Sequence, residues 1–318
     1  MRVVCLAGGV GGAKLADGMQ QVLAPGELTV IVNTGDDFER HSLTICPDHD
    51  TILYTLAGIA DPKQGWGIAA ETWAVMDQLT RLGQDPWFRL GDKDMATHIY
   101  RTEWLRAGAR PTEVAAELAM ALGVRSRILP MTDEPVRTKV QTSGGWIDFQ
   151  DYFVRLRQEP VVLEVRFDGI DKARATPEVV EAIRAAEVLV VAPSNPIVSV
   201  GPILAVPGLL AEIAAARSRG VPAVGVSGIV GGKALRGPAD RMMTSLKHEP
   251  SALGVARLYA GAELLDTFVV DRADEHLADE IRAIGLKVVV TDTIMTDAGS
   301  RATLAREMLT AATESGRR

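Results

Sequence analysis

The chain has 318 residues, of which 47% are hydrophobic and 24% are charged, and its formal net charge is −7. This composition is typical of a soluble globular protein and excludes intrinsic disorder and collagen-like structure. The acidic balance argues against nonspecific binding to nucleic acid or to anionic membranes, which requires an extended basic surface. A phosphorylated small molecule remains compatible with it, because a few cations and backbone amides are enough to bind a diphosphate.

Membrane insertion and secretion are not indicated either. No apolar run approaches the ~18 residues that a membrane span needs, and the apolar stretch at the N-terminus is too short for a signal peptide. The two cysteines, Cys5 and Cys46, have neither zinc-site spacing nor the pattern of a disulfide framework. We therefore expect a cytoplasmic protein in which Cys5 is a buried thiol on the first strand.

The first sixty residues predict the opening of a parallel α/β sheet. A short apolar strand (2–6) passes through glycines into a helix (13–23), and a second strand (28–32) follows. The next segment has helical spacing of its apolar residues. It predicts helices at 69–82, 92–107 and 112–122, then strands at 125–129, 136–142 and 146–148 with an irregular hairpin at 143–145.

From residue 161 the alternation of strands and helices returns. The pattern predicts strands at 161–167, 188–192, 222–227, 267–270 and 287–290, and helices at 177–186, 203–217, 239–247, 251–260 and 298–313. We therefore predict an α/β fold, a Rossmann-like, doubly wound, mostly parallel sheet, in a single unit. Residues 1–60 and 161–318 would form its core, and residues 61–160 a helix-rich insertion.

A glycine-rich segment connects the first strand to the first helix. It reads Gly8-Gly9-Val10-Gly11-Gly12-Ala13-Lys14. Glycines let a phosphate approach the backbone, and a helix N-terminus offers unpaired N–H groups and a positive dipole end. A tight strand-to-helix turn is the alternative. Lys14 replaces the third glycine of G-x-G-x-x-G and no Gly-Lys-Ser/Thr is present, so this motif leaves the nucleotide unspecified.

Acidic residues gather in the two loops that come next. Asp36 and Asp37 follow the second strand, at an edge where doubly wound proteins place ligands, and Asp48 and Asp50 precede an apolar helix. Asp36 and Asp37 could bind Mg²⁺ or hold a ribose and could equally cap the next helix, and Asp50 is also a natural helix N-cap. Four carboxylates in neighbouring loops nevertheless favour a Mg²⁺ site shared with substrate phosphates. Asp36 and Asp50 are the candidate ligands, with Asp48 next.

Later loops add polar groups. A glycine-broken charged loop (88–94) carries Arg89, and the helix after it carries His98 and Arg101. Ser194 and Asn195 end one predicted buried strand, where turn chemistry alone could explain them. Lys233 and Arg236 lie among glycines after another strand, which favours an anion contact. The histidines have no zinc spacing, and no G-x-S-x-G elbow supports a serine nucleophile.

Together these motifs resemble one family, the 2-phospho-L-lactate transferases (CofD/FbiA) of coenzyme F-420 biosynthesis, and its bacterial branch in particular. The resemblance covers nearly the whole chain. In order it rests on residues 8–14, 33–37, 46–54, 65–67 with 71–72, 90–98, 193–196 and 232–240. Arg89 stands where some archaeal members have lysine, which keeps the charge but changes its geometry.

The resemblance implies a homodimeric, Mg²⁺-dependent transferase. The ribityl hydroxyl of the deazaflavin Fo would attack the phosphorus nearest the three-carbon acid of a lactyl- or enolpyruvyl-diphospho-guanosine donor, and GMP would leave. Asp36 and Asp50 would be catalytic and bind the metal, Asp48, Asp50 and Arg89 would contact Fo, and the insertion would form one wall of the Fo cleft. The nucleotide contacts would be Gly9, Gly11, Gly12, Lys14, Ser194, Asn195, Lys233 and Arg236.

Two alternatives remain at the level of the sequence. One is a non-catalytic relative that binds nucleotide sugars and regulates cell-wall metabolism, against which the segments at 47–50 and 90–94 argue. The other is a generic dinucleotide oxidoreductase, which Lys14 disfavours. The sequence does not decide whether the donor carries lactate, enolpyruvate or glycerate.

Overall fold

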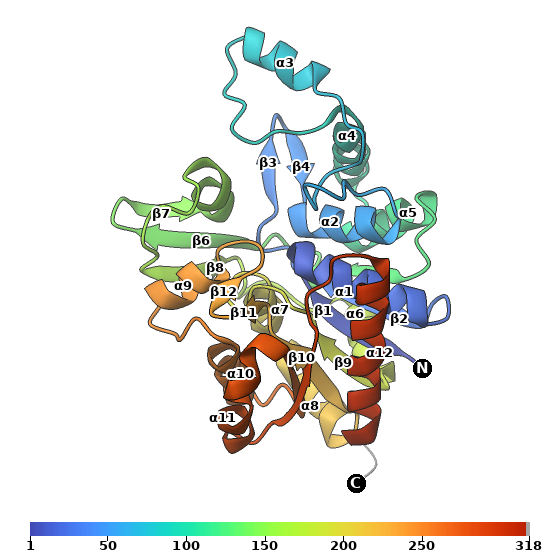
Figure 1. Cartoon of the computed structure of the whole chain (residues 1–318). Coiled ribbons are helices and arrows are strands. Elements are labelled where there is room, and N and C mark those ends of the chain that lie inside the picture. The colour runs from blue at the N-terminus through green and yellow to red at the C-terminus, as the bar shows by residue number, and fades with distance from the viewer. Residues whose placement is uncertain (316–318) are drawn as a thin grey trace.

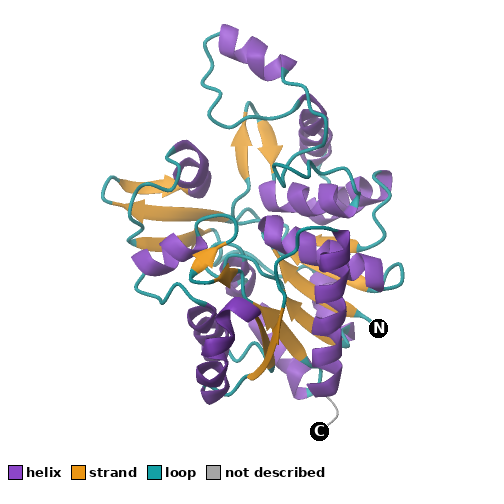
Figure 2. Ribbon diagram, in the orientation of Figure 1, coloured by secondary structure: helices purple, strands orange, loops and turns teal. Residues whose placement is uncertain are grey.

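A seven-stranded, all-parallel sheet forms the centre of the molecule in the computed structural model, which describes residues 1–315 (Figures 1 and 2). Its strand order is β14-β13-β10-β9-β1-β2-β5. The strands are β1 (Val3–Ala7), β2 (Leu28–Val32), β5 (Arg127–Pro130), β9 (Val188–Val191), β10 (Ala223–Val226), β13 (Thr267–Asp271) and β14 (Lys287–Thr291). The predicted parallel α/β core is thus confirmed.

Helices cover both faces of this sheet. On one face α1 (Gly9–Val22), α2 (Pro47–Leu56), α5 (Pro111–Ala121) and α12 (Ala298–Ser315) pack on the side chains of Val3, Cys5 and Ala7. On the other face α6 (Pro177–Ala185), α7 (Val200–Ala205), α8 (Leu209–Ser218), α10 (Ala252–Gly261) and α11 (Ala278–Ala283) share one hydrophobic cluster with Val4 and Leu6. A strand buried on both faces needs a continuous apolar run, which Val-Val-Cys-Leu-Ala of β1 supplies.

The strand order reverses direction at β1. In sequence the chain steps from β1 to β2 and β5 on one side, and from β9 to β10, β13 and β14 on the other. The loops that leave β1 and β9 therefore diverge at the carboxyl edge and open a crevice, which is where doubly wound proteins bind ligands.

The remaining elements lie around this carboxyl edge. A hairpin of β3 (Phe38–Arg40) and β4 (Leu43–Ile45) and the helices α3 (Ala74–Arg81) and α4 (Asp92–Arg106) rise above α2 in Figure 1. Beside them lies an antiparallel sheet of order β7-β6-β8. The other elements are β6 (Arg137–Thr142), β7 (Gly145–Asp148), β8 (Glu164–Asp168), β11 (Ile229–Val230), β12 (Lys233–Ala234), α9 (Ala239–Ser245), a π-helical turn η1 (Asp151–Arg155) and a 3₁₀ helix η2 (Arg272–Leu277).

Three expectations for individual elements were wrong. The strand predicted at 161–167 is β8, which pairs antiparallel with β6 instead of joining the core, whereas β5 forms the edge of the core sheet. The helix predicted at 203–217 is interrupted between α7 and α8 at Gly208, whose φ is 87°. The helix predicted to begin at residue 69 begins at Ala74, after a loop.

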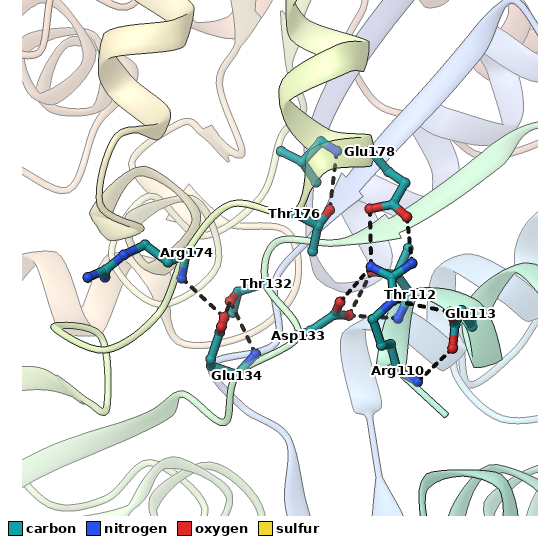
Figure 3. Close-up of polar contacts among 10 residues, drawn as sticks. Arg110, Thr112, Glu113, Thr132, Asp133, Glu134, Arg174, Thr176 and Glu178 are labelled. Atoms are coloured by element: carbon teal, nitrogen blue, oxygen red, sulfur yellow. Dashed lines mark hydrogen bonds and ion pairs between the residues drawn. The ribbon is translucent and has the colours of Figure 1, made fainter. Parts of the chain in front are cut away.

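A polar network around Arg110 connects the start of α5 to the core sheet and to α6 (Figure 3). Arg110, which precedes α5, donates to Glu113, to Asp133 in the loop after β5 (3.2 Å), and to Glu178 in the first turn of α6 (2.6 Å). Thr112 donates from its backbone N–H to Asp133 (2.8 Å). Most of these side chains are still partly open to solvent, which weakens their ion pairs, so the contribution of the network is chiefly geometric. It joins α5, the edge of the sheet and α6.

Within residues 1–315, no helix is long and apolar enough to cross a membrane.

Candidate active site

A cleft with a volume of about 800 Å³ lies at the carboxyl edge of the parallel sheet. Its walls come from the loops after β1, β2, β9, β10 and β14, from the first turn of α2, and from the segment around α3. This volume falls in the range of small-molecule sites. The cleft therefore coincides with the crevice that the strand order creates.

The glycine segment forms the floor of the cleft. The helix α1 begins at Gly9, so the glycines make its first turn instead of a separate loop before residue 13. Gly9 and Gly11 line the cleft, whereas Gly12 packs beneath it, where a Cβ would lie 2.7 Å from Ser194 Oγ. A Cβ on Gly11 would lie 2.4 Å from the Pro193 carbonyl oxygen. Gly11 and Gly12 thus let α1 approach the loop after β9, so the tight-turn interpretation accounts for part of the motif.

Ser194 joins the two loops at the crevice. Its hydroxyl accepts from the Gly8 N–H (3.0 Å) and donates to the Gly8 carbonyl (2.8 Å). Asn195 also lines the cleft, and its side-chain oxygen accepts from the Ile197 N–H (2.9 Å). Both residues lie where the sequence predicts, with part of their hydrogen bonding used to shape the loop.

Cations gather at this end of the cleft. The Lys14 ammonium donates to the Met295 carbonyl (2.9 Å), and Arg236 also lines the cleft. Burial, together with the neighbouring charges of Arg301 and Arg236, lowers the pKa of Lys14. Such a concentration of positive charge favours a bound anion. Lys233, in contrast, is exposed on β12 and is not among the residues that line the cleft, so the structure does not bring it to the predicted site.

Asp36 and Asp48 form a buried acidic pair next to the glycine segment. The Asn33 side-chain amide donates to both carboxylates (3.2 and 2.9 Å), and Asp48 also accepts from the Gly9 N–H (2.7 Å). Burial and the nearby carboxylates of Asp48 and Asp37 raise the pKa of Asp36 well above its usual value, and burial raises the pKa of Asp48 to about 6. Although the charge of Arg137 acts on Asp36, neither carboxylate forms an ion pair within residues 1–315, and two such carboxylates suit a hard divalent cation such as Mg²⁺.

Asp50 has a different environment. The helix α2 begins at Pro47, so Asp50 lies inside the first turn and the N-cap interpretation is wrong. Both of its carboxylate oxygens accept from the Arg101 guanidinium, and His49 Nδ1 lies 3.3 Å away. Although burial raises it, the pKa of Asp50 is held well below its usual range by Arg101. Because its charge is already neutralised, Asp50 is less suited than Asp48 to share a metal with Asp36.

A further polar cluster extends from Asp50 along α4. Asp94 accepts from the Tyr54 hydroxyl (2.7 Å), and His98 Nε2 lies 3.2 Å from Asp94. Ligand atoms of Asp50, Asp94 and His98 all lie within 4.8 Å of one another, so this buried group could hold a metal. Neither Asp94 nor Arg101 has a role predicted from the sequence. Asp94, His98 and Arg101 are spaced at i, i+4 and i+7, which places all three on one helix face. This spacing is the sequence pattern that could have indicated a shared polar cluster.

Segments on either side of α3 also line the cleft. The segment before α3, which carries Trp66, lies next to the glycine segment and the cations, since a Cβ on Gly65 would lie 3.0 Å from Val10 Cγ1 and Arg236 donates to the Gln64 carbonyl (3.4 Å).

After α3, Arg89 lines the cleft, and its guanidinium lies 4.5 Å from the centre of the Trp73 ring. Trp73 precedes α3 instead of lying within a helix, and it is half-buried. Phe88 also lines the cleft and packs edge-on against Trp87 (5.7 Å between ring centres). The wall after α3 is therefore aromatic and carries one exposed cation.

The fold and the site define a class of protein: a doubly wound α/β protein whose crevice combines a glycine-rich helix start, cations and buried carboxylates. Residues 3–309 match the family described as "2-phospho-L-lactate transferase CofD". The chain belongs to this CofD family.

Named relatives are similar over their full length. The chain is 43% identical to a phosphoenolpyruvate transferase of Streptomyces griseus, with 99% of each chain covered. It is 40% identical to the phosphoenolpyruvate transferase of Mycobacterium avium, with 92% of this chain and 94% of that one covered. Among solved structures, a UPF0052-family protein of Bacillus halodurans superposes with a TM-score of 0.61 at 15% identity, covering 97% of this chain and 98% of that one. This last likeness concerns the fold alone.

Proposed function

We propose that this protein transfers an enolpyruvyl-phosphate group from a guanosine diphosphodiester to the ribityl hydroxyl of the deazaflavin Fo, releasing GMP. Membership of the CofD family and the names of the relatives at 40–43% identity support a transferase in coenzyme F-420 biosynthesis. The same names favour enolpyruvate over lactate as the donor's acid, whereas the family description carries lactate.

The observation that carries this proposal is the division of the cleft into chemically distinct ends. Lys14, Arg236 and the glycine segment offer positive charge and backbone N–H groups suited to a diphosphate. The aromatic wall with Phe88 and Arg89 suits a flat tricyclic ring. The buried acidic pair Asp36/Asp48 is also part of the lining. Two substrates that meet at a charged centre fit this arrangement.

The chemistry requires positioning and charge neutralisation more than a protein nucleophile. A bond forms between the ribityl oxygen and the phosphorus nearest the acid, and the bond from that phosphorus to the GMP oxygen breaks. Asp36 lines the cleft at its charged centre and would accept the proton of the attacking hydroxyl. Asp36 and Asp48 would hold Mg²⁺, which supplies neutralisation of the diphosphate charge when bound. Lys14 and Arg236 would hold the departing GMP phosphate.

One experiment tests the proposal directly. The protein is incubated with Fo, GTP, Mg²⁺ and the activating guanylyltransferase, and phosphoenolpyruvate, 2-phospholactate and 3-phosphoglycerate are offered separately. Mass spectrometry then identifies the deazaflavin product. We expect a phosphoenolpyruvyl-linked product that disappears when EDTA replaces Mg²⁺ and is strongly reduced with Asp36→Asn. Binding of a UDP-sugar but not of Fo would instead support a non-catalytic relative.

A further inference from the structure

Two buried acidic side chains at the end of one core strand hydrogen-bond to the backbone of two segments that lead to the lining of the cleft. Asp271 is the last residue of β13, and Asp274 lies in the 3₁₀ helix η2 that follows it. Both side chains are buried, Asp274 to 2% exposure. Neither is among the residues that line the cleft, so any effect on a ligand must act through the residues they contact.

Asp274 anchors the hairpin of β11 and β12. Both of its carboxylate oxygens accept from the Gly231 N–H at 3.1 Å. Gly231 and Gly232 form the turn of this hairpin with φ values of 58° and 76°. Each strand of the hairpin has only two residues, so its own ladder fixes its direction poorly. The segment that follows carries Arg236 into the cleft wall.

Asp271 anchors the loop after β14. One carboxylate oxygen accepts from the Thr293 N–H (2.8 Å) and from the Thr293 hydroxyl (2.9 Å), and the other accepts from the Ala273 N–H (3.0 Å). The loop at 293–296 lines the cleft, and its Met295 carbonyl accepts from the Lys14 ammonium (2.9 Å). The position of Lys14 is therefore coupled through two residues to Asp271.

We propose that Asp271 and Asp274 are positioning residues for the nucleotide diphosphate, because they fix Lys14 and Arg236 relative to one another from a single turn. This inference rests on the proposed function for the assignment of that end of the cleft to the diphosphate. A displacement of about 1 Å in a binding group can cost on the order of 100-fold in rate, so rigid support of the two cations matters. Within residues 1–315, neither aspartate hydrogen-bonds to a residue of the acceptor end of the cleft, so Fo binding should not respond.

The test uses the full-length protein and two titrations. GDP binding is measured by calorimetry and Fo binding by deazaflavin fluorescence, for Asp274→Ala, Asp274→Asn and Asp271→Ala. We expect Asp274→Ala and Asp271→Ala to raise the dissociation constant for GDP about tenfold while that for Fo changes less than twofold. Asp274→Asn keeps one acceptor oxygen for Gly231 and should lie close to the unaltered protein.

A matched control lies at the other end of the same strand. Asp266 precedes β13 and also accepts from a backbone N–H, that of Ala223 (2.8 Å), but at the edge of the sheet opposite the cleft. Asp266→Ala should lower the melting temperature without changing GDP binding. In addition, Asp274→Ala should weaken GDP binding little further in the Arg236→Ala variant. The effects of two substitutions are not additive when the residues act through the same interaction.

The outcomes separate the two proposals. Unchanged GDP binding in both alanine variants, an equal loss of GDP and Fo binding, or full additivity with Arg236→Ala would overturn this inference while leaving the proposed function intact. If Asp274→Ala does not fold, Asp271→Ala and its comparison with Asp266→Ala decide the question by the same criteria. Absence of GDP binding by the unaltered protein would overturn the proposed function, and this inference with it.

Discussion

Removing Arg101 should destabilise the protein in a strongly pH-dependent way. Arg101 is 4% exposed and Asp50 is 5% exposed, and the guanidinium donates to both carboxylate oxygens. Arg101→Met keeps much of the side-chain volume but leaves a buried carboxylate without its partner. Breaking a buried pair in this way costs about 3–5 kcal/mol. Unfolding entropy is about 2.1 cal/mol/K per residue, so over 318 residues this corresponds to a drop of about 5–7 °C in Tm.

The sign of the pH dependence follows from the pKa of Asp50. In the unaltered protein that pKa lies below its unfolded value, so ionised Asp50 contributes stability above about pH 4 that is lost only as pH falls through the folded pKa. Without Arg101, burial is the dominant effect and raises the pKa above the unfolded value. The carboxylate then opposes folding increasingly as pH rises from about 4. The difference in Tm between the two proteins should therefore be larger at pH 8 than at pH 5.

Thermal unfolding followed by circular dichroism at the two pH values measures this difference. Asp50→Asn with Arg101→Met is the matched control, because removing both charges should cost less than the sum of the single changes. Equal losses of Tm at pH 5 and pH 8, together with additive single changes, would refute the assignment of Arg101 and Asp50 as a buried ion pair.

Four further substitutions, one of them a control, test the chemistry of the cleft. Asp36→Asn should lower turnover on the order of 100-fold. It should also raise rather than lower Tm at pH 8, because the raised pKa of Asp36 means that its ionised form opposes folding at that pH. Near-normal turnover at low Mg²⁺ would contradict the assignment of Asp36 as metal ligand and base. Lys14→Ala should weaken GDP binding about tenfold or more and leave Fo binding unchanged. Lys233→Ala is the control, because it alters an exposed cation outside the cleft lining and should change the binding of neither ligand. If calorimetry shows that Lys14→Ala loses Fo binding alone, the assignment of the two ends of the cleft is reversed. Arg89→Ala should raise the dissociation constant for Fo, measured by fluorescence, about two- to fivefold without altering GDP binding. The effect is modest because the Arg89 side chain is half-exposed. An unchanged Fo titration would show that the segment around α3 is not part of the acceptor site.

Several features of this protein follow from the sequence alone. The apolar runs of β1 and β2, the glycines after β1 and the acidic loop after β2 predict a parallel sheet with polar groups at its carboxyl edge. The carboxyl ends of parallel strands meet at one edge, so Gly9, Lys14 and Asp36 converge on one cleft without any knowledge of the strand order. The bounds of α4 and α5 were also close to those predicted, because the helical period in these segments is continuous.

The tertiary structure alone decided which strands pair and which charges meet. The apolar Val165 and Phe167 alternate with Glu164 and Arg166 in β8, a pattern typical of an antiparallel strand with one covered face, yet only its pairing with β6 shows this. Asp50 and Arg101 are 51 residues apart, so no local pattern predicts that the guanidinium neutralises the carboxylate. Lys233 and Arg236 look alike among glycines and both side chains are exposed, but only Arg236, which follows the short hairpin, lines the cleft. Local periodicity is set by the chain's own backbone, whereas the partner of a buried charge depends on how distant elements pack.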